Sequence, residues 1–183
     1  RVRTSWFCSL WTEKSCNSIP KNALGGNMAD EENAIMTTPA KANPRTSASG
    51  HDLTPPSPPE LERLVAGLSP EERRVLLHQG TEPPFCGGLL SNKSHGTYGC
   101  RLCSLPLFRS SAKFESGTGW PSFSESFDPD HIACIRDTSH GMIRTEIRCG
   151  RCGGHLGHVF EDGPAPTGLR YCLNSASLRF ATA

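Results

Sequence analysis

The segment GMIRTEIRCGRCGGHLGHVF, residues 141–160, carries the two patterns that decide the fold. A period of two runs through its first half, with Met142, Arg144, Glu146 and Arg148 on one face and Ile143, Thr145 and Ile147 on the other. This alternation is typical of an antiparallel strand with one buried face. The second half holds the pair Cys149 and Cys152, followed by the strand-like run HLGHVF. The segment therefore predicts β-strands on both sides of a Cys-x-x-Cys pair.

A second Cys-x-x-Cys pair, Cys100 and Cys103, precedes that pair, with 45 residues between Cys103 and Cys149. Four thiolates satisfy tetrahedral zinc, and the two-residue gap lets each turn present both sulfurs to one ion. The fold must bring the two distant pairs together, so the metal would staple a whole sheet. With four cysteine ligands no position is left for a catalytic water, and the zinc is expected to be structural. Iron is the alternative metal, and four buried thiols or a redox pair are the alternatives without metal.

The composition limits the class of protein. The 183 residues suit one domain with a tail, and 18 glycines and 15 prolines predict a loop-rich, mainly β fold with some disorder. A net charge of +1 gives no support to nucleic-acid binding, and no apolar run is long enough to cross a membrane. Nine cysteines are an odd number, and the paired ones favour metal binding in a reducing compartment over a disulfide scaffold.

Residues 1–58 are predicted to be a mostly disordered tail, because residues 37–59 hold six prolines and few apolar side chains. Cys8 and Cys16 lie in this tail and are expected to have no function. Four basic residues and one acidic residue within residues 1–27 would suit a targeting remnant, which makes an organelle the alternative compartment. Met28, followed by ADEEN, resembles an ordinary cytosolic start, so the expected compartment is the cytoplasm.

An ordered domain is expected over residues 59–183 and begins with helices. Apolar residues follow helical spacing in ELERLVAGL, at Leu61, Leu64, Val65 and Leu68. A second helix is predicted to start at Ser69, which can cap the first turn while Pro70 needs no N–H partner and Glu72 completes a capping box. This helix should run to about His78 and stop at Gly80.

Short strands are predicted from residue 86 on, because apolar runs of a few residues alternate with turn residues there. The candidates are GTYGCRLC, ACIRDTS, GMIRTEIRC, HLGHVF and RYCLNSASLRF.

The last of these runs, residues 170–180, contains a cysteine outside both pairs. As one continuous strand it would place alternate residues on a shared face, namely Arg170, Cys172, Asn174, Ala176, Leu178 and Phe180. A nearby Arg170 would lower the pKa of the Cys172 thiol and favour the thiolate, which is the nucleophilic form. The alternative is that Cys172 is a small buried hydrophobic residue.

Two further runs gather polar or aromatic residues. HLGHVFEDGP brings together His155, His158, Glu161 and Asp162. Since the metal already has four sulfur ligands, these histidines are candidate site residues, with core or solvated histidines as the alternative. Trp120 lies in the turn-rich loop SGTGWPSF, where it either packs a core edge or cradles a ligand.

TEPPF, SGTGWPSF, the paired Cys-x-x-Cys motifs, HLGHVFEDGP and RYCLNSASLRF occur in one order and spacing. Together they closely resemble the methionine-R-sulfoxide reductase family, type B, over about residues 58–183. The resemblance implies a β-tent of two antiparallel sheets with short N-terminal helices and a four-cysteine zinc site at the edge.

The resemblance also implies the chemistry of each residue. Cys172 would be the nucleophile that attacks the sulfoxide sulfur, releases methionine and becomes a sulfenic acid. Trp120 would hold the methyl group of the substrate against its indole. His155, His158 and Asn174 would orient and protonate the sulfoxide oxygen. Arg170 would support the thiolate, and Asp162 would hold this network of polar residues.

One position departs from the family pattern. Many members carry a resolving cysteine in the loop before the tryptophan, and here that position is Thr118. Cys86, on the Gly- and Pro-flanked loop PPFCGG, is the expected replacement, and Cys134 in a predicted strand is expected to be fixed and buried. A Cys86–Cys172 disulfide would then be reduced by thioredoxin. Direct reduction of the sulfenic acid by an outside thiol is the alternative.

The loop position of Trp120 suggests an open site that accepts a side chain on a polypeptide, so oxidised proteins are the expected substrates of a monomeric enzyme. Free methionine-R-sulfoxide is the alternative substrate. A noncatalytic, zinc-stabilised interaction module of the same architecture is the alternative function, since fold does not fix function. That module would have no use for Cys172, Arg170 and the histidines together. A peroxide-reducing thiol enzyme is a third possibility, against which Trp120 argues because it suits a methyl-bearing substrate.

Overall fold

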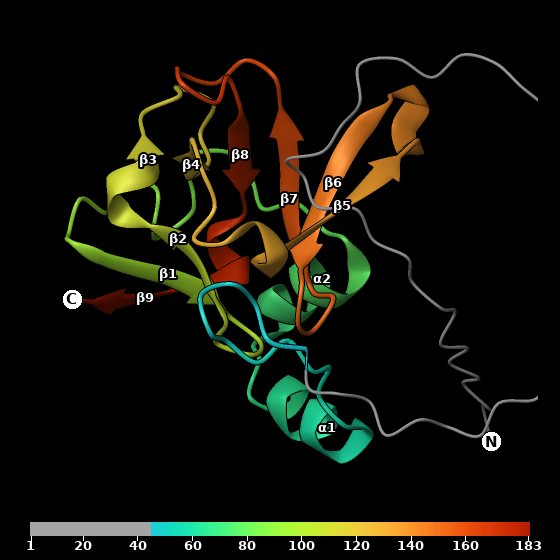
Figure 1. The fold of residues 1–183 in the computed structure, drawn as a ribbon. Coiled ribbons are helices and arrows are strands. Elements are labelled where there is room, and N and C mark those ends of the chain that lie inside the picture. The colour runs from blue at the N-terminus through green and yellow to red at the C-terminus, as the bar shows by residue number, and fades with distance from the viewer. Residues whose placement is uncertain (1–44) are drawn as a thin grey trace, which may run out of the picture.

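The computed structural model describes residues 45–183 and is built on two antiparallel sheets with two short helices (Figure 1). Its helices and strands are α1 (Pro58–Ala66), α2 (Pro70–His78), β1 (Gly96–Cys100), β2 (Pro106–Arg109), β3 (Lys113–Phe114), β4 (Ser122–Phe123), β5 (Ile132–Asp137), β6 (Arg144–Cys149), β7 (His155–Phe160), β8 (Arg170–Leu173) and β9 (Leu178–Thr182). One sheet has the strand order β2-β1-β9, and the other has the order β3-β4-β8-β7-β6-β5. The predicted mainly β fold of two antiparallel sheets is confirmed.

Aromatic side chains pack the two sheets together. Phe108 of the smaller sheet stacks on Phe123 of the larger one, with ring centroids 4.6 Å apart. Tyr98 meets the same Phe123 edge-on at 4.9 Å, and Tyr171 lies 5.5 Å from Phe108. All four rings are almost fully buried. Such pairs add about 0.5–1.5 kcal/mol each beyond the area they bury, so this cluster holds the sheets in register.

Both helices form where the sequence predicts them. The Ser69 hydroxyl accepts from the Glu72 amide at 3.2 Å, and the Glu72 carboxylate accepts from the Ser69 amide at 2.8 Å. The capping box is therefore complete at the start of α2. The helix ends with Gln79 in the left-handed conformation, one residue before the predicted stop at Gly80. Val75 and Leu76 are buried, so α2 packs its apolar face on the domain.

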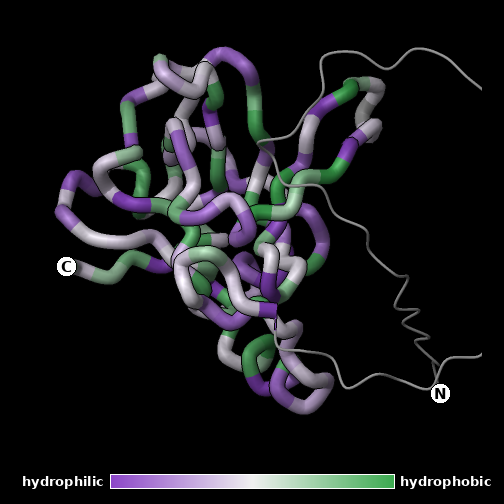
Figure 2. The backbone as a smooth tube through the Cα atoms, viewed as in Figure 1, coloured by the Kyte–Doolittle hydropathy of each residue, from purple (hydrophilic) through white to green (hydrophobic). Residues whose placement is uncertain are grey.

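The predicted alternation holds only in part in β6, and one departure from it matters for the site. Figure 2 shows hydrophilic and hydrophobic residues mixed along the β5–β6 hairpin. The alternation belongs to β6, because β5 is an apolar run that ends in Arg136 and Asp137. Ile147 is fully buried, as expected, but Glu146 on the predicted polar face is only 5% exposed. Met142 and Ile143 were expected to begin this strand, and both precede it and are exposed. The strand is shorter at its start because residues 139–141 form a 3-10 turn.

The run RYCLNSASLRF is not one strand, which corrects the sequence expectation. It forms β8 in the larger sheet, a 3-10 turn η4 (Ser175–Ser177), and β9 in the smaller sheet. The period of two therefore holds for Arg170 and Cys172 but does not continue through the turn. Asn174 caps the turn instead, because its backbone carbonyl accepts from the Ser177 amide at 3.1 Å. The segment crosses from one sheet to the other at the end of the strand that carries Cys172.

Ordered structure begins earlier than the predicted boundary after residue 58. Leu53 is 8% exposed and belongs to the core. The Ser49 amide donates to Asp128 at 2.8 Å, and the Ser47 hydroxyl lies 2.9 Å from Nε2 of His131. Residues 45–57 are therefore not a disordered tail, because they cover a buried histidine and carboxylate. Cys8, Cys16 and the possible targeting segment lie outside the described residues.

Membrane insertion by a helix has no support in the described part of the chain. No helix between residues 45 and 183 has the length and apolar character needed to cross a membrane.

Candidate functional site

The four paired cysteines meet at one point. Their sulfur atoms all lie within 4.8 Å of one another. Cys100 Sγ is 3.6 Å from Cys152 Sγ, and Cys103 Sγ is 3.5 Å from Cys149 Sγ. Each pair comes from a different sheet, since Cys100 ends β1 in the smaller sheet and Cys149 ends β6 in the larger one. The cluster therefore joins the two sheets at one edge, as the spacing predicted.

The geometry of the cluster fits a tetrahedral metal ion. Metal–sulfur bonds of about 2.3 Å put sulfur atoms about 3.8 Å apart in a tetrahedron, close to the observed distances. The three neighbouring thiols, followed by burial, hold the pKa of Cys149 well above its usual range. Four thiolates this close repel one another, and a divalent cation removes that repulsion. The residues present are thus a complete four-sulfur metal site.

An arginine inside each Cys-x-x-Cys turn reaches a different helix. Arg101 forms an ion pair with Glu72, the capping-box residue of α2. Arg151 lies 3.4 Å from Glu60 of α1 and donates to the carbonyl of Cys103 at 3.3 Å. Figure 1 shows both helices at the end of the molecule where the β6–β7 turn lies. The two turns that carry the four sulfurs therefore also attach the helices.

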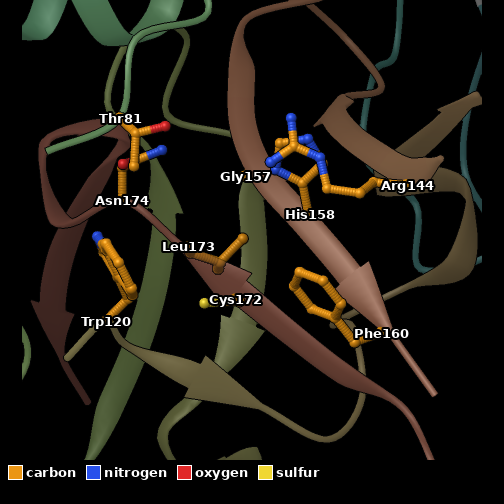
Figure 3. Close-up of a pocket in the computed structure, with 9 residues that line it drawn as sticks. All are labelled: Thr81, Trp120, Arg144, Gly157, His158, Phe160, Cys172, Leu173 and Asn174. Carbon is orange, nitrogen blue, oxygen red and sulfur yellow. The ribbon is translucent and has the colours of Figure 1, made fainter. Parts of the chain in front are cut away.

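Cys172 opens into a pocket of about 130 Å³ between the strands of the larger sheet and the loop that carries Trp120. Its strand β8 lies between β4 and β7, so Ser122 and His158 are its neighbours across the sheet. Figure 3 shows Trp120 on one side of the Cys172 sulfur and His158 with Arg144 on the other. The complete lining is Thr81, Trp120, Arg144, Gly157, His158, Phe160, Cys172, Leu173 and Asn174. Four of the predicted site residues thus meet here: Trp120, His158, Cys172 and Asn174.

His158 is oriented by a carboxylate that the sequence analysis missed. Its Nε2 lies 2.8 Å from Asp137 Oδ2, and Arg144 donates to the same oxygen at 2.7 Å. Burial lowers the pKa of His158, and Arg144 adds to that effect while Asp137 opposes it. A neutral His158 must place its one N–H on Nε2 to serve the carboxylate. Its Nδ1 then keeps a lone pair and can accept a proton.

His155 is likewise bonded to a carboxylate that also binds an arginine, and it is more deeply buried than His158. Its Nδ1 lies 2.7 Å from Glu146 Oε1, and Arg148 donates to both oxygens of that carboxylate. His155 is 3% exposed, and its Nε2 is buried with no hydrogen-bond partner among residues 45–183. The two imidazole rings meet edge-on with centroids 5.7 Å apart. His155 therefore stands beside His158 and outside the residues that line the pocket.

The Cys172 thiol is less acidic than the sequence predicted. Burial raises its pKa, and hydrogen bonds from Thr118, Arg170 and Ser122 with the charge of Arg170 only partly offset this. Arg170 is committed elsewhere, because its Nε and Nη2 donate to Asp162 at 2.9 and 2.8 Å. Its guanidinium also lies over the Phe160 ring at 4.5 Å. The expected lowering of the pKa by Arg170 is present but smaller than the effect of burial.

Glu82 of the TEPPF motif fixes the other wall of the pocket. Its carboxylate accepts from the amides of Ser175 and Ala176, at 2.5 and 3.1 Å, where η4 begins. Its backbone carbonyl accepts from the Trp120 indole at 3.0 Å, and its backbone amide donates to the Asn174 side chain at 3.0 Å. Glu82 is 7% exposed. One residue therefore sets the positions of both the indole and the amide.

Cys86 is exposed on a loop that borders the Trp120 loop. Next to it, the Phe85 amide donates to the Gly119 carbonyl at 2.8 Å. Gly119 has φ +89°, and a Cβ there would lie 2.7 Å from Pro84, so only glycine suits this close approach. Cys134 lies in β5 opposite Ile147, as predicted for a strand position, and is only partly buried.

The comparisons with known proteins agree with this architecture. The family model described as SelR domain matches residues 68–182. The chain belongs to the SelR domain family. It is 66% identical over 137 residues to the peptide methionine sulfoxide reductase MsrB of Caulobacter vibrioides (strain NA1000 / CB15N), covering 75% of this chain and 86% of that protein. The resemblance to type B enzymes drawn from the motifs is confirmed.

Two other relatives carry the same name. The protein of Xylella fastidiosa (strain M23) is 66% identical over 129 residues, covering 70% of this chain and 83% of its own length. That of Escherichia coli (strain K12 / DH10B) is 57% identical over 122 residues, covering 67% and 89%.

Sequence reasoning missed the residues that orient the site. They are Glu82, Asp137, Arg144 and Glu146. The sequence held a weak sign of the role of Glu146, because this residue lies in a predicted strand next to the strand that carries His155 and His158. Asp137 and Glu82 follow no local pattern, since their partners lie 21 and 92 residues away.

Proposed function

We propose that this chain reduces methionine-R-sulfoxide to methionine and that Cys172 is the nucleophile. The observation that carries the proposal is the pocket, where Cys172 shares one small cavity with an indole, a carboxylate-bound imidazole and an amide. A thiol used only for packing would need none of these neighbours. The names of the relatives add support, because each is called a peptide methionine sulfoxide reductase.

The reaction balances as an exchange of oxygen between two sulfur atoms. The Cys172 thiolate attacks the sulfoxide sulfur and forms a sulfur–sulfur bond, while the sulfur–oxygen bond of the substrate breaks and its protonated oxygen leaves as hydroxide. Hydroxide then attacks Cys172 Sγ, the sulfur–sulfur bond breaks, and methionine leaves. Cys172 ends as a sulfenic acid, so it loses the two electrons that the substrate sulfur gains. The oxygen is a poor leaving group until it is protonated, so the site must supply a proton.

His158 is the residue best placed to carry that proton. Its Nδ1 has a free lone pair when Nε2 serves Asp137, and the ring borders the same pocket as Cys172. It can take the thiol proton directly or through one water and then deliver it to the sulfoxide oxygen. Asn174 would hold that oxygen with its amide. His155 would support His158 from behind, and the Arg170–Asp162 pair would support the thiolate.

Trp120 would bind the methyl group of the substrate. Its indole N–H is committed to the Glu82 carbonyl, so the ring is held in place and presents carbon atoms to the pocket. An apolar aromatic face suits a methyl group and gives the site a preference between the two sulfoxide configurations.

Cys86 is proposed as the thiol that resets the enzyme. The Cys86 thiol would attack the Cys172 sulfenic acid, release water and form a disulfide, which a dithiol protein such as thioredoxin reduces by exchange. The exposed position of Cys86 beside the Trp120 loop supports this role. Cys134 has a fixed strand position that makes such an approach harder.

Zinc is the metal proposed for the four-sulfur site, where all four cysteines would hold it and leave no open position. When bound, it would supply structure and no chemistry. Oxidised proteins are the proposed substrates, and the active form is proposed to be a monomer. The cytoplasm is the proposed compartment, because reduced thiols are needed both for the metal site and for Cys172.

The deciding experiment compares the parent with Cys172→Ser. The parent should convert the R but not the S form of N-acetyl-methionine sulfoxide with dithiothreitol as reductant, and Cys172→Ser should show no turnover. Zinc content and the circular dichroism spectrum of both proteins control for folding. A Cys172→Ser protein that still turned over the R-sulfoxide would refute the nucleophile. Turnover of hydrogen peroxide without turnover of the sulfoxide would favour the peroxide-reducing alternative instead.

The resetting thiol is identified by mass spectrometry after one equivalent of R-sulfoxide without reductant. The expected product is a peptide pair linked through Cys86 and Cys172. A stable sulfenic acid on Cys172 would show that an outside thiol resets the enzyme, and a link to Cys134 would move the role to that residue.

A further inference from the structure

Three hydroxyl groups form a row that starts at the Cys172 sulfur and that none of the roles above uses. Thr118 Oγ1 lies 3.9 Å from Cys172 Sγ. The Ser116 hydroxyl lies 2.8 Å from Thr118 Oγ1 and 2.7 Å from the Ser122 hydroxyl. The Ser122 hydroxyl in turn lies 3.2 Å from the Trp120 carbonyl oxygen. The row therefore links the thiol to the backbone of the residue proposed to bind the methyl group.

The direction of the hydrogen bonds follows from counting protons. Each hydroxyl has one proton to donate. The Trp120 carbonyl can only accept, so Ser122 donates to it and must accept from Ser116. Ser116 has then used its own proton and accepts from Thr118. The Thr118 proton thus points away from the sulfur, and its oxygen offers a lone pair to the S–H of the neutral thiol.

The same row can run in the opposite direction. If the three O–H bonds rotate, Ser122 donates to Ser116, Ser116 donates to Thr118, and Thr118 donates to the sulfur. Ser116 keeps enough acceptor capacity in both directions, because its oxygen has two lone pairs. Within residues 45–183 its only other donor is the Thr118 amide at 3.4 Å. Only the Trp120 carbonyl loses its hydroxyl donor. No covalent bond is broken and no proton passes between residues.

We propose that this row of hydroxyls reverses when Cys172 loses its proton, so that Thr118 stabilises the thiolate by a hydrogen bond. The inference rests on the proposed role of Cys172 as nucleophile. Burial disfavours the thiolate, and Arg170 is largely occupied by Asp162, so the site needs another donor close to the sulfur. The hydrogen bond from Thr118 favours the charged form of Cys172. Residue 118 then serves as a hydroxyl donor in this chain, at the position where many family members carry a second thiol.

The reversal costs little free energy, because the three hydroxyls are partly or fully buried and are already hydrogen-bonded to one another. Ser122 is fully buried, and Ser116 and Thr118 are half-buried, so water competes little for these hydroxyls. Hydrogen bonds to a charged group are about twice as strong as neutral ones, so the thiolate gains more than the Trp120 carbonyl loses. The expected gain corresponds to a shift of about one pH unit in the ionisation of Cys172, or about a tenfold change in thiolate fraction.

The first test measures how the rate of Cys172 alkylation by iodoacetamide depends on pH, with the modified peptide identified by mass spectrometry. Thr118→Val, which keeps the shape but loses the hydroxyl, should move the midpoint upward by about one unit. Thr118→Ser should retain the parent midpoint. Ser124→Ala is the matched control, because the Ser124 hydroxyl binds the Ala112 carbonyl in the same strand region and is not part of the row. It should leave the midpoint unchanged.

The second test detects the reversal itself. In a protein that carries carbonyl-labelled tryptophan and the changes Trp6→Phe and Trp11→Phe, the infrared band of Trp120 should move to higher frequency as Cys172 ionises, since that carbonyl loses a donor. The shift should be absent in Thr118→Val over the same pH range. A parent-like alkylation midpoint in Thr118→Val, or an unchanged Trp120 band in the parent, overturns the proposal. Neither measurement needs a sulfoxide, so its outcome is independent of the Cys172→Ser turnover assay that tests the proposed function.

Discussion

The four-cysteine cluster and the pocket of Cys172 place the same side chain in opposite settings. In the cluster each thiol has three other sulfurs as its neighbours, and the chain supplies a complete coordination sphere from two sheets. In the pocket the thiol has hydroxyls, an imidazole and an indole around it, and no second sulfur within hydrogen-bond distance among the described residues. Spacing in the sequence creates the first setting, and tertiary contacts create the second. The comparison teaches that the cluster should govern stability and the pocket should govern rate.

The sharpest way to break this comparison is to remove one ligand of the cluster. Cys149→Ala should abolish the cooperative fold, because a structural zinc site contributes about 10 kcal/mol or more of folding free energy, comparable to the whole stability of a domain. Circular dichroism and metal analysis of the purified variant check this, and a strong chelator added to the parent should have the same effect. A folded, fully active Cys149→Ala protein would contradict the structural role.

On the pocket side, Asp137→Asn should slow sulfoxide reduction by about tenfold to a hundredfold, because His158 loses the carboxylate that orients it. The melting temperature should change far less than in Cys149→Ala. Steady-state rates with dithiothreitol measure the effect. Asp130→Asn, which removes an exposed carboxylate from the turn before β5, is the control and should keep the parent rate. Equal losses in both variants would argue against a specific role for Asp137.

Cys86→Ser separates the two halves of the proposed cycle. It should leave a single turnover unchanged, because Cys172 attacks first, and should reduce cycling with thioredoxin by at least about tenfold. Rapid quench and steady-state assays on the same sample give the two rates. Unimpaired cycling with thioredoxin would exclude Cys86 as the resetting thiol.

The smallest effect is expected for the arginines within the Cys-x-x-Cys turns. Arg101→Gln should lower the free energy of unfolding by only about 0.5 kcal/mol, because its ion pair with Glu72 is partly open to water. Urea denaturation measures this, and turnover should stay at the parent level. A clear loss of turnover in Arg101→Gln would mean that the cluster and the pocket are coupled, and it would weaken the comparison.

Local signals predicted much of this molecule. The four-sulfur cluster follows from two short motifs, and α2 follows from its capping box, because both depend on residues close in the sequence. The choice of Cys172 also came from its motif. The break at η4 was missed, because Ser175–Ser177 looks like strand sequence and turns only where Glu82, from far away, accepts its amides.

The charges that tune the pocket were not predictable in the same way. Glu146 lies on the polar face of an alternating strand, and nothing local shows that a histidine and an arginine bury it. The raised pKa of Cys172 has the same origin, since it depends on how deeply β8 lies between its neighbours. Sequence patterns could predict the fold, whereas the electrostatics of the site could be derived only from the tertiary structure.

The loop that carries Cys86 is tied at both ends to the turn that follows Cys172. Glu82 binds the first amides of η4, and the Leu89 amide lies 3.4 Å from the Ser175 hydroxyl. The loop between these two anchors is short, so its thiol samples only a small volume. In a loop of this kind the local concentration of a tethered group reaches the millimolar range or above. Few free thiols in solution could match that, and the anchoring of Glu82 would thus decide how quickly an oxidised site is closed.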